Sequence, residues 1–461
     1  MGQLIAGAAR VRLDPPLGIG MAGYGRRVGR ASGVHDDLAA QALVLGDGHH
    51  KAAIVSVDLL AIGLRIVDEI CAIVAARSDI PADAILVCAT HTHSGPLFNI
   101  HATPKADAKV ADDRSLAWER ALPEKIASAV IDANARLGPA TLKAASARFT
   151  LGTNRRLRRP DGTVQLAANH VGVADAAANA AGVYRSDGSA LAYLLNYPCH
   201  AVVLCEDNLR YSRDWPGFAI DEIERLGGSK YGGAGQRPIA LFLQGATGNI
   251  DPHSRGSFEV AAEHGAALGR AAFDALERAP LAQCERTTAR SIPLTLRLRD
   301  LDTALEIARN YVAQTELSLK NHRGGEGIQL KRLRDHCAQA KEALATVASL
   351  DEANRRDRRV NREHGEIATR LLALALGDVA IVGIGGEPFV ELGLALKANP
   401  YFAHTLVAGY CNDLVGYLPT REAYRDGGYE VETSRVAEGS GELIVATLLS
   451  ALREMSAAPA P

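Results

Sequence analysis

Short apolar runs recur along this chain, and each of them ends in a polar or glycine-rich turn. Two of these runs, at 52–57 and 84–89, flank a segment at 64–76 that has helical spacing. Apolar runs of about four to eight residues bounded by turns are typical of buried strands. Their alternation with helices predicts an α/β or α+β fold in which central mixed β-sheets are flanked by helices. Further runs of this kind lie at 191–195, 239–243 and 379–384.

The stretch at 302–365 differs from the rest because it is rich in Ala, Leu, Glu, Lys and Arg. It is interrupted at Gly324-Gly325 and closes with a charged run at 351–359. This composition predicts a helical hairpin that packs on the main body and turns its charged faces to solvent. Charge runs are usually solvent-exposed faces, so we expect scaffold here rather than a binding element.

Composition and charge narrow the class of protein further. The 461 residues, 47% hydrophobic and 23% charged, are typical of a globular enzyme with one large domain or two ordinary ones. A formal net charge of −2 gives no reason to expect nucleic acid or an anionic membrane as a partner.

Compartment is indicated by the cysteines and by the lack of membrane segments. The seven cysteines are scattered, odd in number and free of C-x-x-C pairs, which is typical of a reducing compartment. No apolar run reaches the roughly 18 residues of a membrane span, and the start lacks a signal-peptide pattern. We therefore expect a cytoplasmic protein without integral membrane association, and the sequence leaves homo-oligomerisation open.

The segment at 18–23 spells G-x-G-x-x-G, the pattern of a dinucleotide-binding loop. Such a loop needs a strand before it and a helix after it. Here Asp14-Pro15-Pro16 precedes the glycines and Tyr24-Gly25-Arg26-Arg27 follows them, so neither condition holds. We interpret the segment as a glycine-rich turn.

His91 and His93 are the strongest candidates for chemistry, since they stand two residues apart at the end of the predicted strand 84–89. Two neutral imidazoles at a strand end can point into one cavity, and zinc binds imidazole nitrogen readily. The alternative is a hydrogen-bonded histidine pair at a tight turn. His200, Glu387 and Tyr417 also follow predicted strands or glycine turns, but spacing alone does not single them out among 14 histidines and many carboxylates.

Taken together, several segments resemble the catalytic domain of the neutral/alkaline (non-lysosomal) ceramidase family. The most specific is Thr-His-Thr-His-Ser-Gly-Pro at 90–96, and others are Met-Ala-Gly-Tyr-Gly at 21–25 and Gly-Val-His at 33–35. The resemblance extends to about Tyr429 and so covers most of the chain. It implies a single catalytic domain over 1–456, with the hairpin at 302–365 inserted in it.

The resemblance also implies the roles of individual side chains. His93 would border the catalytic water, accept its proton and return that proton to the leaving amine. Tyr429 would contact the reacting carbonyl, and Arg155, in an Asn-Arg pair, would help to stabilise the oxyanion. The implied zinc ligands are two imidazoles, a carboxylate and an unusual phenol, namely His91, His200, Glu387 and Tyr417.

One segment departs from the family pattern. Where the family has Gly-Asp-Val-Ser-Pro, with a serine proposed to take part in catalysis, this chain has Gly-Asn-Ile-Asp-Pro at 248–252. Asp251 cannot act as a serine nucleophile, so a metal-activated water is the more economical attacker. Asp251 would either act in catalysis by orienting a histidine as a hydrogen-bond acceptor, or only cap the turn at Pro252.

These observations predict a Zn²⁺-dependent hydrolase that cleaves a non-peptide carbon–nitrogen bond. A linear or cyclic small-molecule amide is the first expected substrate, and an N-acyl lipid amide is the second. N-acylsphingosine is less expected, because the chain ends near the close of the catalytic domain, without the ceramidases' C-terminal sandwich domain or secretion signal. The alternatives are a zinc esterase or lactonase, and a binding protein that kept the fold and lost the chemistry.

Overall fold

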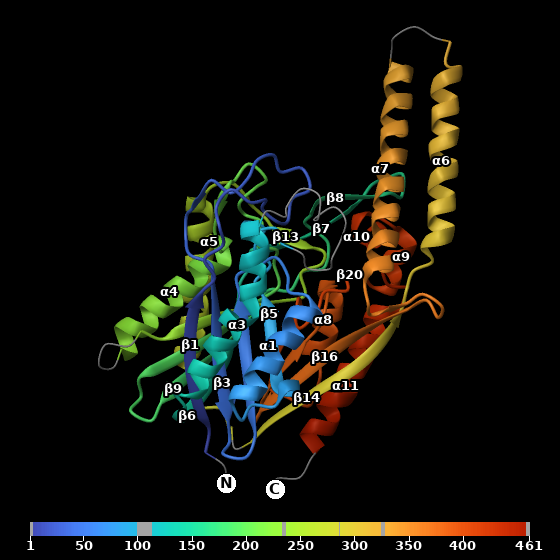
Figure 1. Ribbon diagram of the computed structural model, residues 1–461. Helices are drawn as coiled ribbons and strands as arrows, with labels where there is room; N and C mark the ends of the chain where they lie inside the picture. Colours follow the sequence, from blue (N-terminus) through green and yellow to red (C-terminus); the bar gives the residue numbers. More distant parts are fainter. Residues whose placement is uncertain (1–2, 99–112, 233–236, 285, 324–327, 458–461) are drawn as a thin grey trace.

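Two β-sheets pack face to face and carry helices on both outer sides, which gives the protein four layers (Figure 1). The computed structural model describes residues 3–98, 113–232, 237–284, 286–323 and 328–457. Leu43, Ile54 and Leu86 of one sheet meet Leu374 and Ile381 of the other in a buried core. The predicted architecture of central mixed sheets flanked by helices is confirmed.

The larger sheet contains eight strands, and the predicted strands at 52–57, 84–89, 191–195 and 239–243 all belong to it. Its order is β12 (Ile239–Gln244), β10 (Ala190–Tyr197), β9 (Ala177–Arg185), β6 (Gly138–Arg148), β1 (Ile5–Arg12), β3 (Ala39–Gly46), β4 (Lys51–Val57) and β5 (Ile85–Ala89). Only β10 with β12 and β4 with β5 are parallel pairs. The helices on its outer face are α1 (Leu64–Arg77), α3 (Asp113–Asn134), α4 (Asp214–Tyr231) and α5 (Phe258–Arg278), and η1 (Ala82–Ala84) precedes β5.

The smaller sheet lies across the shared core. Its order is β14 (Thr287–Arg297), β16 (Glu366–Leu376), β17 (Val379–Gly383) and β19 (His404–Ala408), and β15 (Val360–Asn361) also pairs with β16. Alternate residues of these strands face the two sides, because side chains in a strand have a period of two. Its other face packs against α8 (Val390–Lys397) and α11 (Ser440–Ala457).

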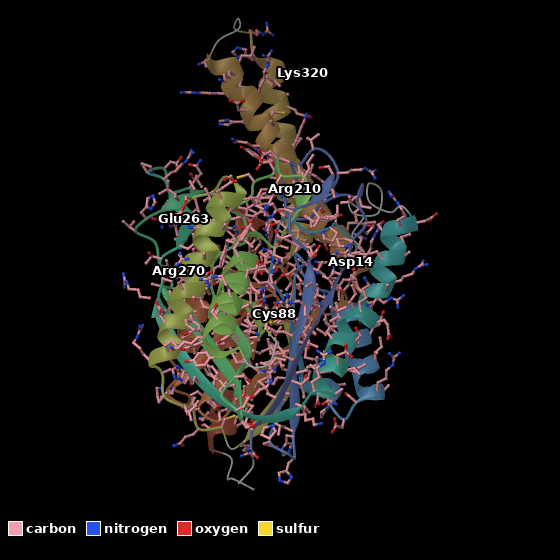
Figure 2. All side chains as sticks on the ribbon, turned by 90° about the vertical axis from the view of Figure 1, so that its left-hand side faces the viewer. Asp14, Cys88, Arg210, Glu263, Arg270 and Lys320 are labelled. Atoms are coloured by element: carbon pink, nitrogen blue, oxygen red, sulfur yellow. The ribbon has the colours of Figure 1, made fainter. Side chains whose placement is uncertain are left out.

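The predicted helical hairpin exists as α6 (Leu301–Asn321) and α7 (Ile328–Arg356), but its placement was predicted incorrectly. Most of its length projects away from the body, as Figures 1 and 2 show, instead of packing on it. Leu301, Leu305 and Val347 form a small core between the two helices near the body. The predicted break at Gly324-Gly325 lies outside the described residues.

Small elements gather at the end of the sheets where β5 and β10 finish. They are β2 (Gly33–Val34) with β11 (Arg210–Tyr211), β7 (Gly152–Arg158) with β8 (Val164–Asn169) and β13 (Ile250–Pro252), β18 (Glu387–Pro388) with β20 (Tyr417–Leu418), α9 (Arg421–Asp426) and α10 (Tyr429–Glu432). Side chains on loops at strand ends are not required for packing within the sheet, so a binding or catalytic site is expected at this end. Within the described ranges, none of the helices is long and apolar enough to cross a lipid bilayer.

Candidate active site

His91 and His200 are held in the same way, each by a backbone carbonyl at its Nδ1 atom. His91 follows β5 directly, and its Nδ1 lies 2.7 Å from the carbonyl oxygen of Leu60. The Nδ1 of His200, three residues after β10, lies 3.0 Å from the carbonyl oxygen of Ile250. A carbonyl oxygen can only accept, so each Nδ1 carries the proton and donates it. Both Nε2 atoms are therefore left with a free lone pair, the form in which imidazole binds a metal.

The two free nitrogens converge on one carboxylate. The Nε2 atoms of His91 and His200 each lie 3.7 Å from Oε2 of Glu387. Burial would raise the pKa of Glu387, but the neighbouring His200, His91 and Arg155 lower it below its usual value, so the group is ionised. Two neutral imidazoles and one carboxylate are the usual protein share of a catalytic zinc site. The donor atoms present thus fit a zinc ion.

Tyr417 is brought beside Glu387 by the backbone, because the two residues are paired partners in the parallel strands β18 and β20. Its hydroxyl oxygen lies 3.0 Å from Nη2 of Arg155. The ring of Tyr429 lies 5.7 Å from that of Tyr417, edge to face. Tyr429 is 47% exposed, so it stands at the mouth of the site.

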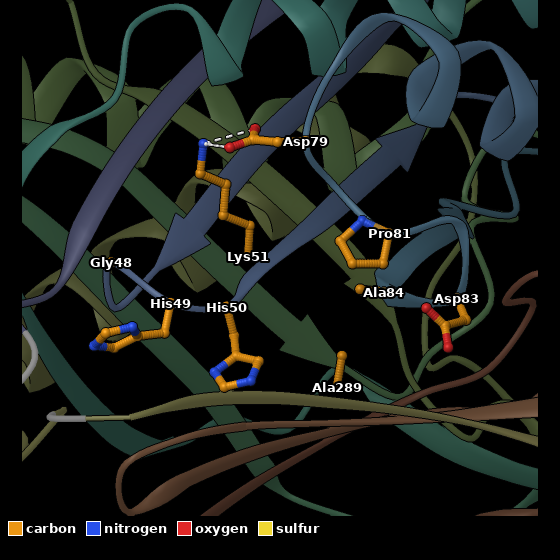
Figure 3. Close-up of a pocket in the computed structure, with 9 residues that line it drawn as sticks. All are labelled: Gly48, His49, His50, Lys51, Asp79, Pro81, Asp83, Ala84 and Ala289. Atoms are coloured by element: carbon orange, nitrogen blue, oxygen red, sulfur yellow. Dashed lines mark hydrogen bonds and ion pairs between the residues drawn. The ribbon is translucent and has the colours of Figure 1, made fainter. Parts of the chain in front are cut away.

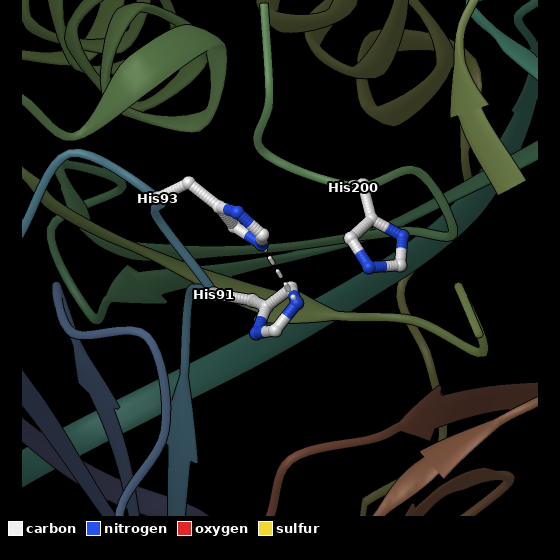
Figure 4. A group of neighbouring side chains, drawn as sticks. All are labelled: His91, His93 and His200. Atoms are coloured by element: carbon white, nitrogen blue, oxygen red, sulfur yellow. Dashed lines mark hydrogen bonds between the residues drawn. The ribbon is translucent and has the colours of Figure 1, made fainter. Parts of the chain in front are cut away.

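His93 completes a group of three imidazoles (Figure 4). Its Nε2 lies 3.2 Å from Nε2 of His91, and one ring nitrogen from each of His91, His93 and His200 falls within 4.8 Å of the others. Its Nδ1 is buried and has no hydrogen-bond partner in the part of the chain that the structure describes. Burial and the neighbouring imidazoles hold the pKa of His93 well below its usual value, so the ring is neutral. This position suits a general base, and it also suits a third imidazole ligand.

The glycine-rich segment at 18–23 is a turn, as predicted, and it packs against His93. Gly23 has φ +96°, and a Cβ atom there would stand 2.5 Å from the His93 ring. The ring of Tyr24 lies 5.0 Å from that of His93, edge to face. Nη2 of Arg27 donates to the His93 carbonyl at 2.8 Å. The segment therefore fixes the position of His93, and only glycine fits where it approaches the ring.

Arg155 is buried, and every N–H of its guanidinium is already directed at a neighbour. Nε donates to Glu430 at 2.9 Å, Nη1 to Asp251 at 3.1 Å, and Nη2 to the carbonyl of Gly248 at 2.8 Å and to the Tyr417 hydroxyl at 3.0 Å. Nη1 also lies 3.4 Å from Nε2 of His200. Burial opposes the charge, yet nearby Tyr417, Asp251 and Glu430 raise the pKa of Arg155 well above its usual value. These contacts leave no free N–H for a substrate oxyanion.

Asp251 belongs to the Arg155 network and does not orient a histidine. It accepts from Arg155 and forms an ion pair with Arg255 on its other oxygen. The Nδ1 of His200 lies 3.8 Å from Asp251 but donates to Ile250 instead. Burial would raise the pKa of Asp251, but Arg155, His200 and Arg255 lower it, so the group is a carboxylate.

Two contributors to the site were not foreseen from the sequence, Tyr410 and Glu430. The Tyr410 hydroxyl donates to Oε2 of Glu387 at 3.1 Å and lies 2.6 Å from Oγ1 of Thr247. Its ring stacks on His91 with centroids 4.0 Å apart and planes 29° apart. Tyr410 lies two residues after β19, so the strand-end rule that selected His91 could have found it. Glu430 carries no such signal, because it is a buried carboxylate on the short helix α10.

Replacing Tyr410 with phenylalanine should weaken zinc binding by about 10- to 100-fold, because a partner that orients a metal ligand typically contributes that much. The ring that stacks on His91 stays, and the hydrogen bonds of the hydroxyl to Glu387 and Thr247 are lost. Zinc affinity, measured by competition with a chelator, checks this. Tyr211→Phe is the matched control, since the buried Tyr211 donates to the carbonyl of Pro16 at 2.9 Å, away from the histidines. Equal zinc affinity in the two variants would contradict the role of Tyr410.

A second pair of histidines, His49 and His50, lies at the opposite end of β4. They line a pocket of about 300 Å³ together with Lys51, Asp79 and Asp83 (Figure 3). In this pocket Lys51 pairs with Asp79 at 2.7 Å, and His49 and His50 are exposed. The pocket takes no part in the arrangement around Glu387.

The comparisons with known proteins agree with this geometry. Residues 13–268 match the model of the neutral/alkaline non-lysosomal ceramidase family, N-terminal part. No curated protein matches the chain. Among solved structures, a neutral ceramidase from Pseudomonas aeruginosa is similar at 17% identity with a TM-score of 0.69. A ceramidase complexed with C2 is similar at 18% identity with a TM-score of 0.71.

Both likenesses cover 100% of this chain and 77% of the other chain. At such low identity, they establish a shared fold over the whole chain and nothing finer. The family match is more specific, because it includes the segment with His91, His93, His200 and Asp251 and spans more than half of the residues. The chain therefore belongs to the neutral/alkaline non-lysosomal ceramidase family, a family of hydrolases.

Proposed function

We propose that this protein is a zinc-dependent amide hydrolase that cleaves a non-peptide carbon–nitrogen bond by direct attack of water. The observation that carries the proposal is the convergence of two Nε2 lone pairs on one ionised carboxylate, at 3.7 Å each. His91, His200 and Glu387 would hold the ion, and Tyr417 would be the fourth ligand. When bound there, zinc would act as a Lewis acid and lower the pKa of a water molecule towards neutrality.

The side chains around this centre have different roles in the reaction. The neutral imidazole of His93 accepts a proton and returns it to the nitrogen of the leaving amine. Tyr429, at the mouth of the site, donates its hydroxyl hydrogen bond to the carbonyl oxygen as that oxygen becomes negative. Arg155 acts as a positioning residue, because its contact with the Tyr417 hydroxyl favours the ionised phenol that a metal ligand needs.

Water is the favoured nucleophile because Asp251 has no hydroxyl and is engaged by two arginines. No acyl-enzyme is therefore expected. An amide is favoured over an ester because His93 is placed to protonate a leaving nitrogen, a step that an ester needs less. Within amides, we place small-molecule amides first and ceramide second. The family name and the ceramidase complexed with C2 support the latter as a substrate to be tested.

The test is a panel of matched amide and ester pairs together with a short-chain ceramide, assayed before chelation, after chelation and after return of zinc. We expect at least one amide to be hydrolysed, activity to vanish on chelation, and zinc to restore it. The same reaction run in ¹⁸O-labelled water should put the label in the released acid and leave the protein mass unchanged. Turnover of esters alone would exclude the amide assignment, and a covalent acyl adduct would exclude direct attack by water.

A further inference from the structure

A pocket of about 320 Å³ lies beside the zinc-binding residues, and Arg155 and Asp251 form part of its wall. Arg155 also donates to the Tyr417 hydroxyl, and both Arg155 and Asp251 lie near His200. Strands β7, β8 and β13, which form one three-stranded sheet, supply most of the rest of the lining. Arg155 therefore belongs both to the wall of this pocket and to the hydrogen-bond network of the metal site.

Three polar side chains in this wall still have hydrogen-bonding capacity, namely Thr153, His253 and Arg255. Arg255 pairs with Asp251 through a single nitrogen, and within the described ranges its other N–H groups have no acceptor. The hydroxyl of Thr153 and the ring nitrogens of His253 likewise make no hydrogen bond to any described residue. The side chain of Arg255 is 37% exposed, so its unused donors are accessible from solvent.

The two arginines in the pocket wall differ in their partners and in their exposure. Arg155 is buried and pairs with both Glu430 and Asp251. Arg255 is the more exposed of the two and pairs with Asp251 through one nitrogen. A guanidinium that still has free N–H groups matches a carboxylate better than it matches a neutral group.

The size of the pocket limits what else it can hold. About 320 Å³ is at the low end of small-molecule sites, which typically run from about 300 to 1,000 Å³. Leu166 and Pro252 supply apolar surface beside the charged groups. Such a space suits a short polar group and not a long alkyl chain.

We propose that this pocket binds a carboxylate carried by the substrate, so that the preferred substrates are amides with an acidic group close to the scissile bond. The assignment rests on the proposed function, because it names the substrate class of the same site. In the reaction, water adds to the amide carbonyl, the carbon–nitrogen bond breaks, and the products are an acid and an amine. The bound carboxylate does not react, and it orients the amide relative to Glu387 and His93.

The experiment compares acid and carboxamide members of a matched series, N-acetylglycine, N-acetyl-β-alanine and N-acetyl-γ-aminobutyrate, each with its neutral carboxamide. In the holoenzyme, at least one acid should exceed its carboxamide in kcat/KM by about tenfold or more, the usual worth of a charge-assisted hydrogen bond. Arg255→Gln should remove that preference, mainly by raising KM for the acid, and change turnover of the carboxamide less than about threefold.

The control variant is Arg270→Gln on α5, which removes an exposed arginine paired with Glu222 outside the pocket (Figure 2). It should keep the acid preference of the wild type. If Arg255→Gln lowers turnover of both members equally, Arg255 supports the metal site through Asp251 and the carboxylate pocket is wrong.

A binding experiment tests the carboxylate pocket independently of the proposed amide hydrolysis. If no amide in the series is hydrolysed, calorimetry with the same six compounds still decides. Saturable binding of an acid, absent for its carboxamide and lost in Arg255→Gln, would support the pocket even if the amidase proposal fails. Equal binding of acid and carboxamide, or binding of neither, would overturn it.

Discussion

Replacing His91 or His200 with alanine should abolish both zinc retention and hydrolysis. Each substitution removes one of the two nitrogens that meet at Glu387. The loss should exceed the roughly 10- to 100-fold that follows from removing a hydrogen-bond partner of a ligand, because the ligand itself is gone. Neither variant should unfold the sheets, since both residues lie beyond the ends of their strands, β5 and β10.

The measurement is metal content by elemental analysis beside activity on the amide found in the panel. The wild type should hold about one zinc per chain, bound by nitrogen and oxygen and by no thiolate. His49→Ala is the matched control, because His49 is exposed at the opposite end of β4 (Figure 3). Full activity of the wild type after thorough chelation and dialysis would contradict the metal assignment, and so would a His91→Ala variant that keeps its zinc.

The sheets could be predicted because their strands are buried and therefore apolar. Runs such as 84–89 and 379–384 stand out against polar turns, and the rule that functional side chains follow strand ends indicated His91 and His93. His200 was singled out only by the family resemblance. The ends of the hairpin were less predictable. The segment at 357–365 looked helical, but Asp357 pairs with Arg359 and Arg435 and the chain turns there into β15.

The interior of the site could not be predicted in the same way, because its contacts join residues far apart in the chain. Arg155 reaches Glu430 and Tyr417, and nothing local to the Asn-Arg pair indicates that its donors are all used. Tyr410 reaches Glu387 through a backbone turn with φ +57°, a conformation that tyrosine seldom adopts. The projection of the hairpin away from the sheets could not be predicted either. The sequence shows which helix faces are polar, but it does not show whether those helices pack against the rest of the protein.

The remaining large effect concerns His93. His93→Ala should lower kcat by about 10²- to 10⁴-fold, the usual contribution of a general acid and base, and leave the zinc content unchanged. We expect the zinc to be retained because of where the imidazoles lie. The Nε2 atoms of His91 and His200 meet Glu387, whereas the Nε2 of His93 lies 3.2 Å from that of His91. Metal analysis, activity and pH profile are measured together on the same preparation.

These measurements distinguish the two roles that the arrangement of three imidazoles allows for His93, namely general base and metal ligand. Added imidazole should partly restore activity to His93→Ala if the residue moves protons, because a free base can enter the space that the side chain leaves.

Gly23→Ala is an independent probe of His93. The new methyl group would stand 2.5 Å from the His93 ring and displace that ring without removing any donor atom. That variant should lose rate and keep zinc. A His93→Ala protein that purifies without metal, together with a Gly23→Ala protein of reduced zinc affinity, would make His93 a ligand. The proton would then have to be accepted by another group.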